Sequence, residues 1–254
     1  MGFHPTTHIL KPSPERFKYL SENEWFQARL AQGMGLNVAP SKLIKIGKAY
    51  CLLVTRYDRY QAENEWMRLH QEDFCQALGV SGRKKYQKEG GPSFLDCINI
   101  INERSFYPLE DIDSLLRWQI FNLLIGNCDA HAKNISLLRG AKGHWRLAPF
   151  YDLVATKVYP DLSSQLAMAV GSQYDSGMTQ ASHWQSLFKK CQVSPTQYSQ
   201  ILIKMLQIFP SKIKLTQQQF IKEYGESPIL ERLDKVYNAQ IRHLQNGFKK
   251  IELK

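Results

Sequence analysis

The chain has 254 residues, of which 43% are hydrophobic and 22% are charged, and these proportions exclude a disordered chain, a collagen and a coiled coil. No apolar run reaches the roughly 18 residues that a membrane-spanning helix needs, and no charged region followed by an apolar one marks a secretory signal. The formal net charge of +10 suits a polyanionic partner such as nucleic acid, nucleotide phosphate or an acidic protein face. Because no basic helix or zinc-finger pattern accompanies this charge, we expect neither sequence-specific nucleic-acid binding nor membrane association.

The cysteines point to a reducing compartment. Their number is odd, their spacing is wide and no C-x-x-C motif occurs, which excludes a zinc ribbon and argues against a disulfide framework. We therefore expect a cytoplasmic protein with buried thiols. The cysteines are Cys51, Cys75, Cys97, Cys128 and Cys191.

The N-terminal part of the chain predicts a strand, a helix and a hairpin of two strands. The expected ranges are residues 4–11 for the first strand, 21–33 for the helix, and 42–46 and 50–56 for the hairpin. β-branched residues and the terminating Pro12 indicate the first strand. Ser21 and Glu24 have the spacing of a capping box at the start of the helix, and Gly33 ends it. The turn at Gly47 indicates the hairpin.

After residue 57 the pattern becomes mostly helical. The expected elements are helices at 72–78, 94–102 and 112–126, a basic glycine-rich loop at 81–93, a hairpin of 135–138 and 144–147, and three helical segments from about residue 182 onward. The segment 112–126 is apolar on all sides, which is typical of a central buried helix. We therefore expect two domains, residues 1–57 and 58–254, with a ligand site near their junction.

The most informative stretch is the polar loop that follows this apolar helix. It carries Asp129 and Asn134, five residues apart, and the next hairpin leads to Asp152. Phosphoryl transfer uses such a set, because one carboxylate accepts or orients the substrate hydroxyl proton while a second carboxylate and an amide hold Mg²⁺ against nucleotide phosphates. The order is that of kinase-like catalytic loops. In a purely structural alternative Asp129 and Asn134 only shape turns, and His131 and Lys133 either contact phosphate or only line the loop.

The N-terminal part can supply groups to the same site. Lys11, at the end of the first strand, could put a charge on the α- and β-phosphates of a nucleotide; taken alone, it would be an exposed surface lysine. Glu24 could orient this lysine, although the capping box already accounts for Glu24. The apolar strand 52–57 runs into the junction, where its last backbone groups would contact an adenine edge.

Together these residues resemble the HipA family of serine/threonine kinase toxins from bacterial toxin–antitoxin modules. The similar segments follow the order of the family along most of the chain, and the one at 129–134 is quite specific. They are residues 5–11, 23–24, 35–38, 56–59, 71–76, 85–86, 90–92, 129–134, 149–152 and 166–168. The resemblance implies an α+β, protein-kinase-like fold of two lobes, with a truncated N-lobe, a mostly helical C-lobe and ATP bound between them.

The resemblance also implies roles for individual residues. Lys11 corresponds to the lysine on the ATP phosphates and Asp129 to the catalytic base, while Asn134 and Asp152 correspond to Mg²⁺ ligands. Residues 55–57 match the hinge segment, with a threonine where the family has an acidic residue. The candidate nucleotide contacts are Lys11, Thr55, Arg56, Tyr57, His131, Lys133 and Tyr151.

On this resemblance we expect the chain to phosphorylate a serine or threonine of a protein, with aminoacyl-tRNA synthetases as targets of the family, and to associate with a DNA-binding antitoxin. The family places an N-terminal subdomain and a glycine-rich phosphate loop upstream of residues 5–11. We therefore expect a piece of a longer gene, a chain completed by a separate polypeptide, or an inactive remnant. The alternative function is accordingly that of a catalytically incomplete module that binds an antitoxin or partner chain. A small-molecule phosphotransferase is a third interpretation, which the position of His131 after Asp129 disfavours.

Overall fold

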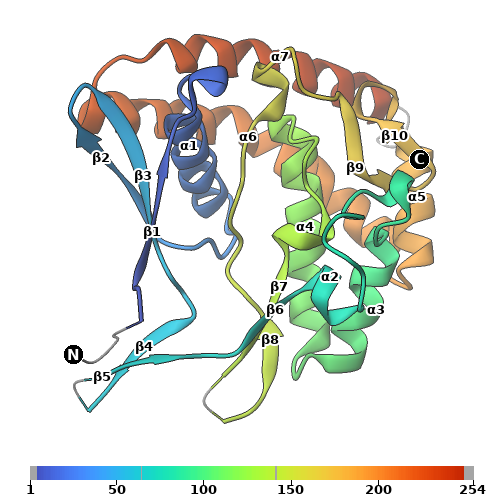
Figure 1. Ribbon diagram of the computed structural model, residues 1–254. Coiled ribbons are helices and arrows are strands. Elements are labelled where there is room, and N and C mark those ends of the chain that lie inside the picture. Colours follow the sequence, from blue (N-terminus) through green and yellow to red (C-terminus); the bar gives the residue numbers. More distant parts are fainter. Residues whose placement is uncertain (1–4, 64, 141, 249–254) are drawn as a thin grey trace.

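The structure, a computed structural model, describes residues 5–63, 65–140 and 142–248. A small antiparallel sheet with one helix occupies one side of the molecule, and a mainly helical part lies beside it (Figure 1). One continuous hydrophobic core joins the two parts, since its buried side chains run from Trp25 to Phe248. Among the described residues, no helix combines the length and the apolar character that crossing a membrane would require.

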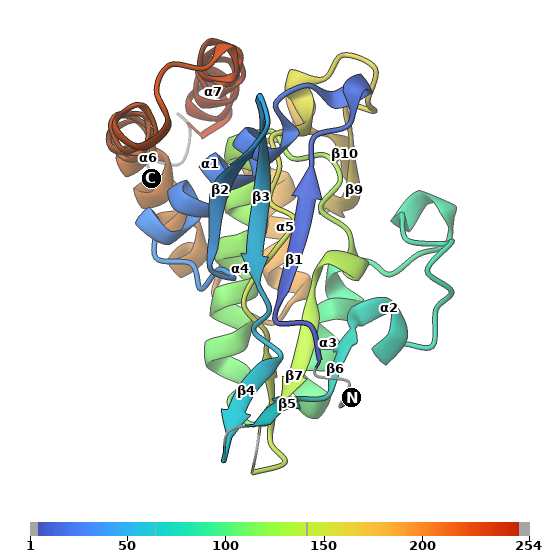
Figure 2. The ribbon, with the colours of Figure 1, turned by 60° about the vertical axis from the view of Figure 1, so that its left-hand side comes forward.

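The N-terminal sheet has the strand order β1–β3–β2, and all its neighbours are antiparallel. Its strands are β1 (His8–Pro12), β2 (Ser41–Ile46) and β3 (Ala49–Thr55), and the helix that accompanies them is α1 (Leu20–Gly33). Figure 2 shows α1 behind the sheet. Leu43, Leu52 and Val54 of the sheet are buried, which provides the apolar face that α1 covers. The predicted hairpin of β2 and β3 is confirmed.

The predicted capping box at the start of α1 is wrong. The helix begins at Leu20, and the residue before it, Tyr19, makes no side-chain hydrogen bond to the helix. Instead, the Ser21 hydroxyl donates to the carbonyl oxygen of Lys11 over 2.9 Å, and Glu24 accepts a hydrogen bond from the Lys11 ammonium over 2.6 Å. Both polar side chains therefore tie α1 to β1. The first strand begins later than predicted, and residue 4 lies outside the described residues.

The middle of the described chain contains three further small sheets. They are β4 (Arg59–Ala62) with β5 (Glu65–Arg68), β6 (Gln71–Asp73) with β7 (Ser136–Arg139) and β8 (Trp145–Leu147), and β9 (Gln165–Val170) with β10 (Gln173–Asp175). The β7–β8 hairpin confirms the prediction. The predicted helix at 72–78 is wrong in its first residues, because β6 pairs with β7 and only α2 (Phe74–Ala77) is helical. The sequence did not reveal β5, since all its residues are exposed and show no apolar alternation.

The other predicted helices are confirmed. Their bounds are α3 (Phe94–Arg104), α4 (Pro108–Ile125), α5 (Ala181–Lys190), α6 (Pro195–Tyr224) and α7 (Pro228–Phe248). Short 3₁₀ helices occupy η1 (Glu15–Phe17), η2 (Gln87–Glu89), η3 (Ala132–Asn134), η4 (Thr156–Val158) and η5 (Ser176–Met178). Helix α4 is central (Figure 1), and its side chains at Leu116, Phe121 and Leu124 are completely buried.

The end of α4 fixes where the polar loop starts. Gly126 follows the helix with a φ of 69°, in the left-handed region that glycine adopts without strain. A Cβ at this position would lie 2.9 Å from Cγ1 of Val236, which belongs to α7. Glycine therefore lets the chain turn at the end of α4, and the polar loop begins directly after it.

Candidate active site

A cavity of about 750 Å³ separates the end of β1 from the polar loop and from the segment after β8. Of the ten predicted site residues, seven line it: Lys11, Asp129, His131, Lys133, Asn134, Tyr151 and Asp152. β1, the polar loop and the segment after β8 come from distant parts of the chain, so only the fold brings these side chains together. Glu24, Asp73, Lys85 and Asn127 also line the cavity, and the sequence had not marked the last three as site residues.

Lys11 lies between two carboxylates. Its ammonium donates to Oε1 of Glu24 over 2.6 Å and also pairs with Asp152. The pKa of Glu24 rises to about 7, because its burial and the nearby Asp152 carboxylate outweigh the attraction of Lys11. Burial opposes the charge on Lys11 as well, but the two carboxylates raise the pKa of this lysine above its usual value. Lys11 therefore stays charged, which a contact to phosphate requires.

Glu24 should make the stability of the chain depend on pH. Between pH 4.5 and about 7 the folded chain holds a proton on Glu24 that the unfolded chain has lost, so stability falls as the pH rises through this window. The two pKa values correspond to a loss of about 3 kcal/mol. Glu24→Gln should remove that loss, as measured by urea unfolding at pH 4.5 and pH 8. Glu103→Gln, on the exposed surface of α3, is the matched control. Equal pH dependence in both variants would contradict the assignment.

The polar loop holds Asp129 by several hydrogen bonds. Its Oδ1 accepts a hydrogen bond from the Tyr86 hydroxyl over 2.7 Å, and the Lys85 ammonium lies 3.6 Å from the same oxygen. Its backbone N–H donates to Oδ1 of the buried Asn127 over 3.0 Å. The Asn134 amide donates from Nδ2 to the carbonyl oxygen of Asp129 over 3.2 Å. Asp129 is thus oriented while its side chain stays 44% exposed and lines the cavity.

The alternatives for His131 and Lys133 can now be compared with their positions. His131 is 3% exposed, and its ring packs edge-on against Tyr86 at 5.8 Å between centroids. Burial lowers its pKa, despite the opposing charge of Asp129, so the ring is neutral at physiological pH. Lys133 donates to Oδ2 of Asp73 over 2.9 Å. Both residues line the cavity, and both also have structural contacts that account for their positions.

The predicted hinge residues lie outside the cavity lining. The backbone N–H of Thr55 donates to the carbonyl oxygen of Pro40 over 2.7 Å, and that of Arg56 donates to Thr7 over 2.9 Å. Tyr57 stacks on Tyr151 with 6.0 Å between ring centroids. The backbone N–H groups of Thr55 and Arg56 are therefore already bonded within the N-terminal part, and contact of residues 55–57 with an adenine edge stays a prediction.

The donor set fits a nucleotide with Mg²⁺. Because Nδ2 of Asn134 donates to Asp129, the other amide atom, Oδ1, is the one that can coordinate a cation. Asp152 has a φ of 53°, a conformation that aspartate adopts more readily than most residues. Mg²⁺ usually takes one or two protein ligands and completes its octahedron with phosphates and water. Among the described residues, no group of three histidine, cysteine, aspartate or glutamate side chains could hold a metal ion.

A family model described as "HipA-like C-terminal domain" matches residues 1–213. "Putative kinase Y4mE" of Sinorhizobium fredii is 47% identical over 189 residues, which are 74% of this chain and 45% of that protein. "Serine/threonine-protein kinase toxin HipA" of Shewanella oneidensis is 37% identical over 187 residues, 68% of this chain and 42% of that protein. The chain thus spans less than half the length of both relatives.

Two solved structures are similar in fold. HipA of Shewanella oneidensis, in a complex with HipB and its operator DNA, matches with a TM-score of 0.85 and 26% identity over 96% of this chain and 59% of that chain. The proinflammatory kinase CtkA of Helicobacter pylori matches with a TM-score of 0.63 and 14% identity over 100% of this chain and 96% of that chain. The predicted resemblance and the α+β, kinase-like fold are confirmed.

Proposed function

The chain belongs to the family described as HipA-like C-terminal domain, and on that basis we propose that it is a serine/threonine protein kinase of a bacterial toxin–antitoxin module. Similarity to proteins named as kinases supports kinase chemistry for the family as a whole. The observation that carries the proposal for this chain is a single cavity that joins Lys11, Asp129, Asn134 and Asp152. These are the groups that phosphoryl transfer requires.

Each of these residues has a defined task in the proposed reaction. The Lys11 ammonium binds phosphate oxygens of ATP, and Glu24 orients the lysine by accepting a hydrogen bond from it. Asn134 and Asp152 bind Mg²⁺, which neutralises phosphate charge when bound. Asp129 accepts the proton of the substrate hydroxyl. The hydroxyl oxygen then forms a bond to the γ-phosphorus as the bond to the leaving ADP breaks, so that the products are a phosphorylated protein, ADP and a proton.

The proposed partners come from the relatives. The Shewanella HipA structure contains HipB and operator DNA, and we propose a DNA-binding antitoxin as a partner of this chain as well. The resemblance to the family supports aminoacyl-tRNA synthetases as the class of protein substrate, and the cytoplasm as the compartment.

The direct test is phosphoryl transfer from ATP labelled at the γ-phosphate. Purified aminoacyl-tRNA synthetases serve as acceptors, and mass spectrometry locates the modified residue. Label on serine or threonine, dependent on Mg²⁺, supports the kinase. The second candidate function is a binding module without transfer, the alternative that the sequence left open. Stable capture of an antitoxin without any transfer would support that module instead.

Tyr86 should contribute to the rate through its hydrogen bond to Asp129. Tyr86→Phe removes a bond to a charged group, worth roughly 1.5–3 kcal/mol, and we expect kcat to fall by about tenfold or more. The KM for ATP should change little, because Tyr86 contacts Asp129 and not Lys11. Tyr60→Phe, at a partly exposed position in β4, is the matched control. A raised KM for ATP with unchanged kcat would contradict this role.

A further inference from the structure

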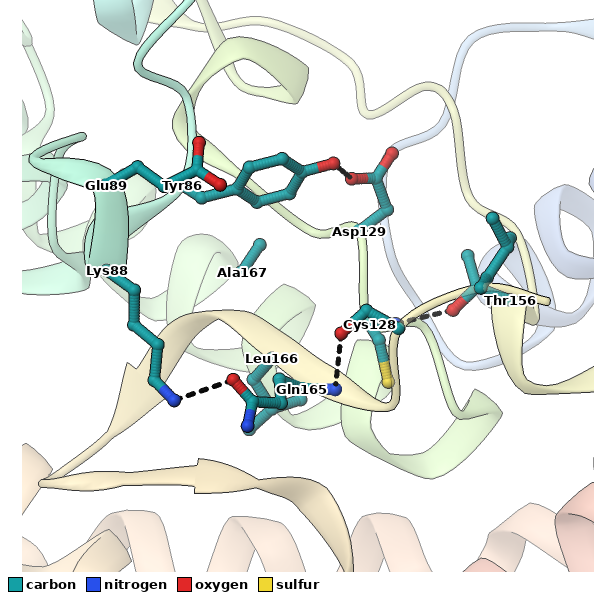
Figure 3. Close-up of a pocket in the computed structure, with 11 residues that line it drawn as sticks. Tyr86, Lys88, Glu89, Cys128, Asp129, Thr156, Gln165, Leu166 and Ala167 are labelled. Atoms are coloured by element: carbon teal, nitrogen blue, oxygen red, sulfur yellow. Dashed lines mark hydrogen bonds between the residues drawn. The ribbon is translucent and has the colours of Figure 1, made fainter. Parts of the chain in front are cut away.

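Figure 3 shows a second cavity, which adjoins the larger one and shares Asp129, Thr156 and Leu162 with it. Its volume is about 280 Å³, just below the size of a site for a drug-sized ligand and sufficient for one side chain. Asp129 lines this cavity as well as the larger one. Lys11, Asn134 and Asp152, the groups suited to nucleotide phosphates, line only the larger cavity. The phosphate-binding groups therefore leave the second cavity free. A protein substrate can bring its hydroxyl to Asp129 from that cavity.

Hydrogen bonds hold the walls of the second cavity in place. The Lys88 ammonium donates to Oε1 of Gln165 over 2.6 Å across its mouth. Next to it, Oε1 of Gln87 accepts a hydrogen bond from the backbone N–H of Ala169 over 2.8 Å. On the inner side, the N–H of Ala167 donates to the carbonyl oxygen of Cys128 over 3.0 Å. These bonds join the η2 segment to β9 and β9 to the catalytic loop, so the cavity is part of the folded framework.

The chemistry of the lining changes from mouth to floor. Leu166, Ala167 and Cys128 are buried at 7%, 4% and 4% exposure, which gives an apolar floor. Ser163 and Gln165 are exposed and form part of a polar mouth together with Lys88. Such a lining suits an apolar side chain whose backbone remains at the surface.

Tyr86 shows how a hydroxyl reaches Asp129 from this side. Its ring forms part of the cavity wall, and its hydroxyl points at the carboxylate (Figure 3), with 2.7 Å to Oδ1. A substrate hydroxyl must make the same kind of bond to lose its proton. Since Tyr86 occupies Oδ1, the second carboxylate oxygen is the one left for the acceptor.

We propose that this second cavity binds one apolar side chain next to the acceptor serine or threonine of an extended protein segment. The proposal rests on the proposed kinase function, and it deepens that function by naming a feature of the substrate. Burying a leucine side chain favours binding by roughly ten- to one-hundred-fold over leaving it exposed. Substrate segments with glycine beside the hydroxyl residue should therefore bind more weakly by at least tenfold.

The test uses the complete chain of 254 residues and fluorescent 11-residue peptides with a central serine. The residues before and after the serine are varied through glycine, alanine and leucine, and affinity is measured by fluorescence anisotropy. We expect leucine on one side of the serine to bind at least tenfold more tightly than glycine. Ser163→Trp, which plugs the mouth from the exposed rim, should abolish that preference. Ser211→Trp, at an exposed position in α6, should keep it.

The outcomes separate this proposal from the kinase function, because peptide binding does not need phosphoryl transfer. Equal affinity for leucine and glycine peptides, the absence of any binding, or a preference that survives Ser163→Trp would each overturn the second cavity as the substrate site. A preference that Ser163→Trp removes supports it. If that preference is found while no peptide or synthetase is phosphorylated, the kinase function fails and the binding site stands.

Discussion

Asp129→Asn should reduce phosphoryl transfer by roughly 10²- to 10⁴-fold, the range by which general bases accelerate reactions. The change keeps the size of the side chain and removes the group that accepts the proton. Asparagine can still accept the hydrogen bond from Tyr86, which is 2.7 Å in the structure, so the loop should keep its conformation. The assay is transfer of γ-phosphate to a protein acceptor at saturating ATP and Mg²⁺.

The melting temperature and a matched variant provide the controls for Asp129→Asn. The melting temperature should stay close to that of the unchanged chain, because the Asp129 side chain is 44% exposed and asparagine has nearly the same shape. Asp161→Asn removes the same charge at an exposed position and should leave transfer intact. If Asp129→Asn retained near-normal transfer while Asp161→Asn behaved as expected, Asp129 would not be the base.

Asp152→Asn should weaken Mg²⁺-dependent nucleotide binding by roughly ten- to one-hundred-fold, the amount expected from losing an interaction with a charged group. The expected effect of Asn134→Ala is smaller, because Mg²⁺ is a hard cation and depends strongly on ligand charge. Asparagine is preferred to alanine at position 152, since the backbone there has a φ of 53° that asparagine tolerates well.

Isothermal titrations with ATP, with and without Mg²⁺, distinguish the metal role from a general loss of affinity. Asp152 also pairs with Lys11, so its replacement frees the lysine for phosphate and should not weaken binding in the absence of Mg²⁺. Equal and small effects of Asp152→Asn and Asn134→Ala in the presence of Mg²⁺ would contradict the metal assignment.

Part of the fold could be predicted because its signals are local. The hairpin of β2 and β3 has two apolar runs around Gly47, and α4 carries a dense apolar stretch that only isolated polar residues such as Arg117 and Gln119 interrupt. Both patterns follow directly from burial and turn chemistry. The fully exposed strand β5 carries no such signal. Glu72 and Asp73 of β6 were mistaken for helix because they gain their structure from pairing with the distant β7.

In the candidate site, too, the residues with a local signal were predicted and those defined by long-range contacts were not. Asp129 and Asn134 lie five residues apart in a loop between recognisable elements, so their spacing was visible. Tyr86 carried no local signal, since its bond to Asp129 spans 43 positions. A polar side chain in a glycine-rich loop gives no indication of which distant group it will meet.

The amino-acid sequence alone predicted the family and the kinase-like fold, because the motifs follow one another in order along the chain, and both predictions are confirmed. It also predicted Lys11, Asp129, Asn134 and Asp152 as one functional set. The tertiary structure decided what these residues touch. It placed Glu24 on Lys11 instead of at a helix cap, and it opened a second cavity beside Asp129. Lys11 and Asp152 are 141 positions apart, and only packing around the common core brings such groups within bonding distance.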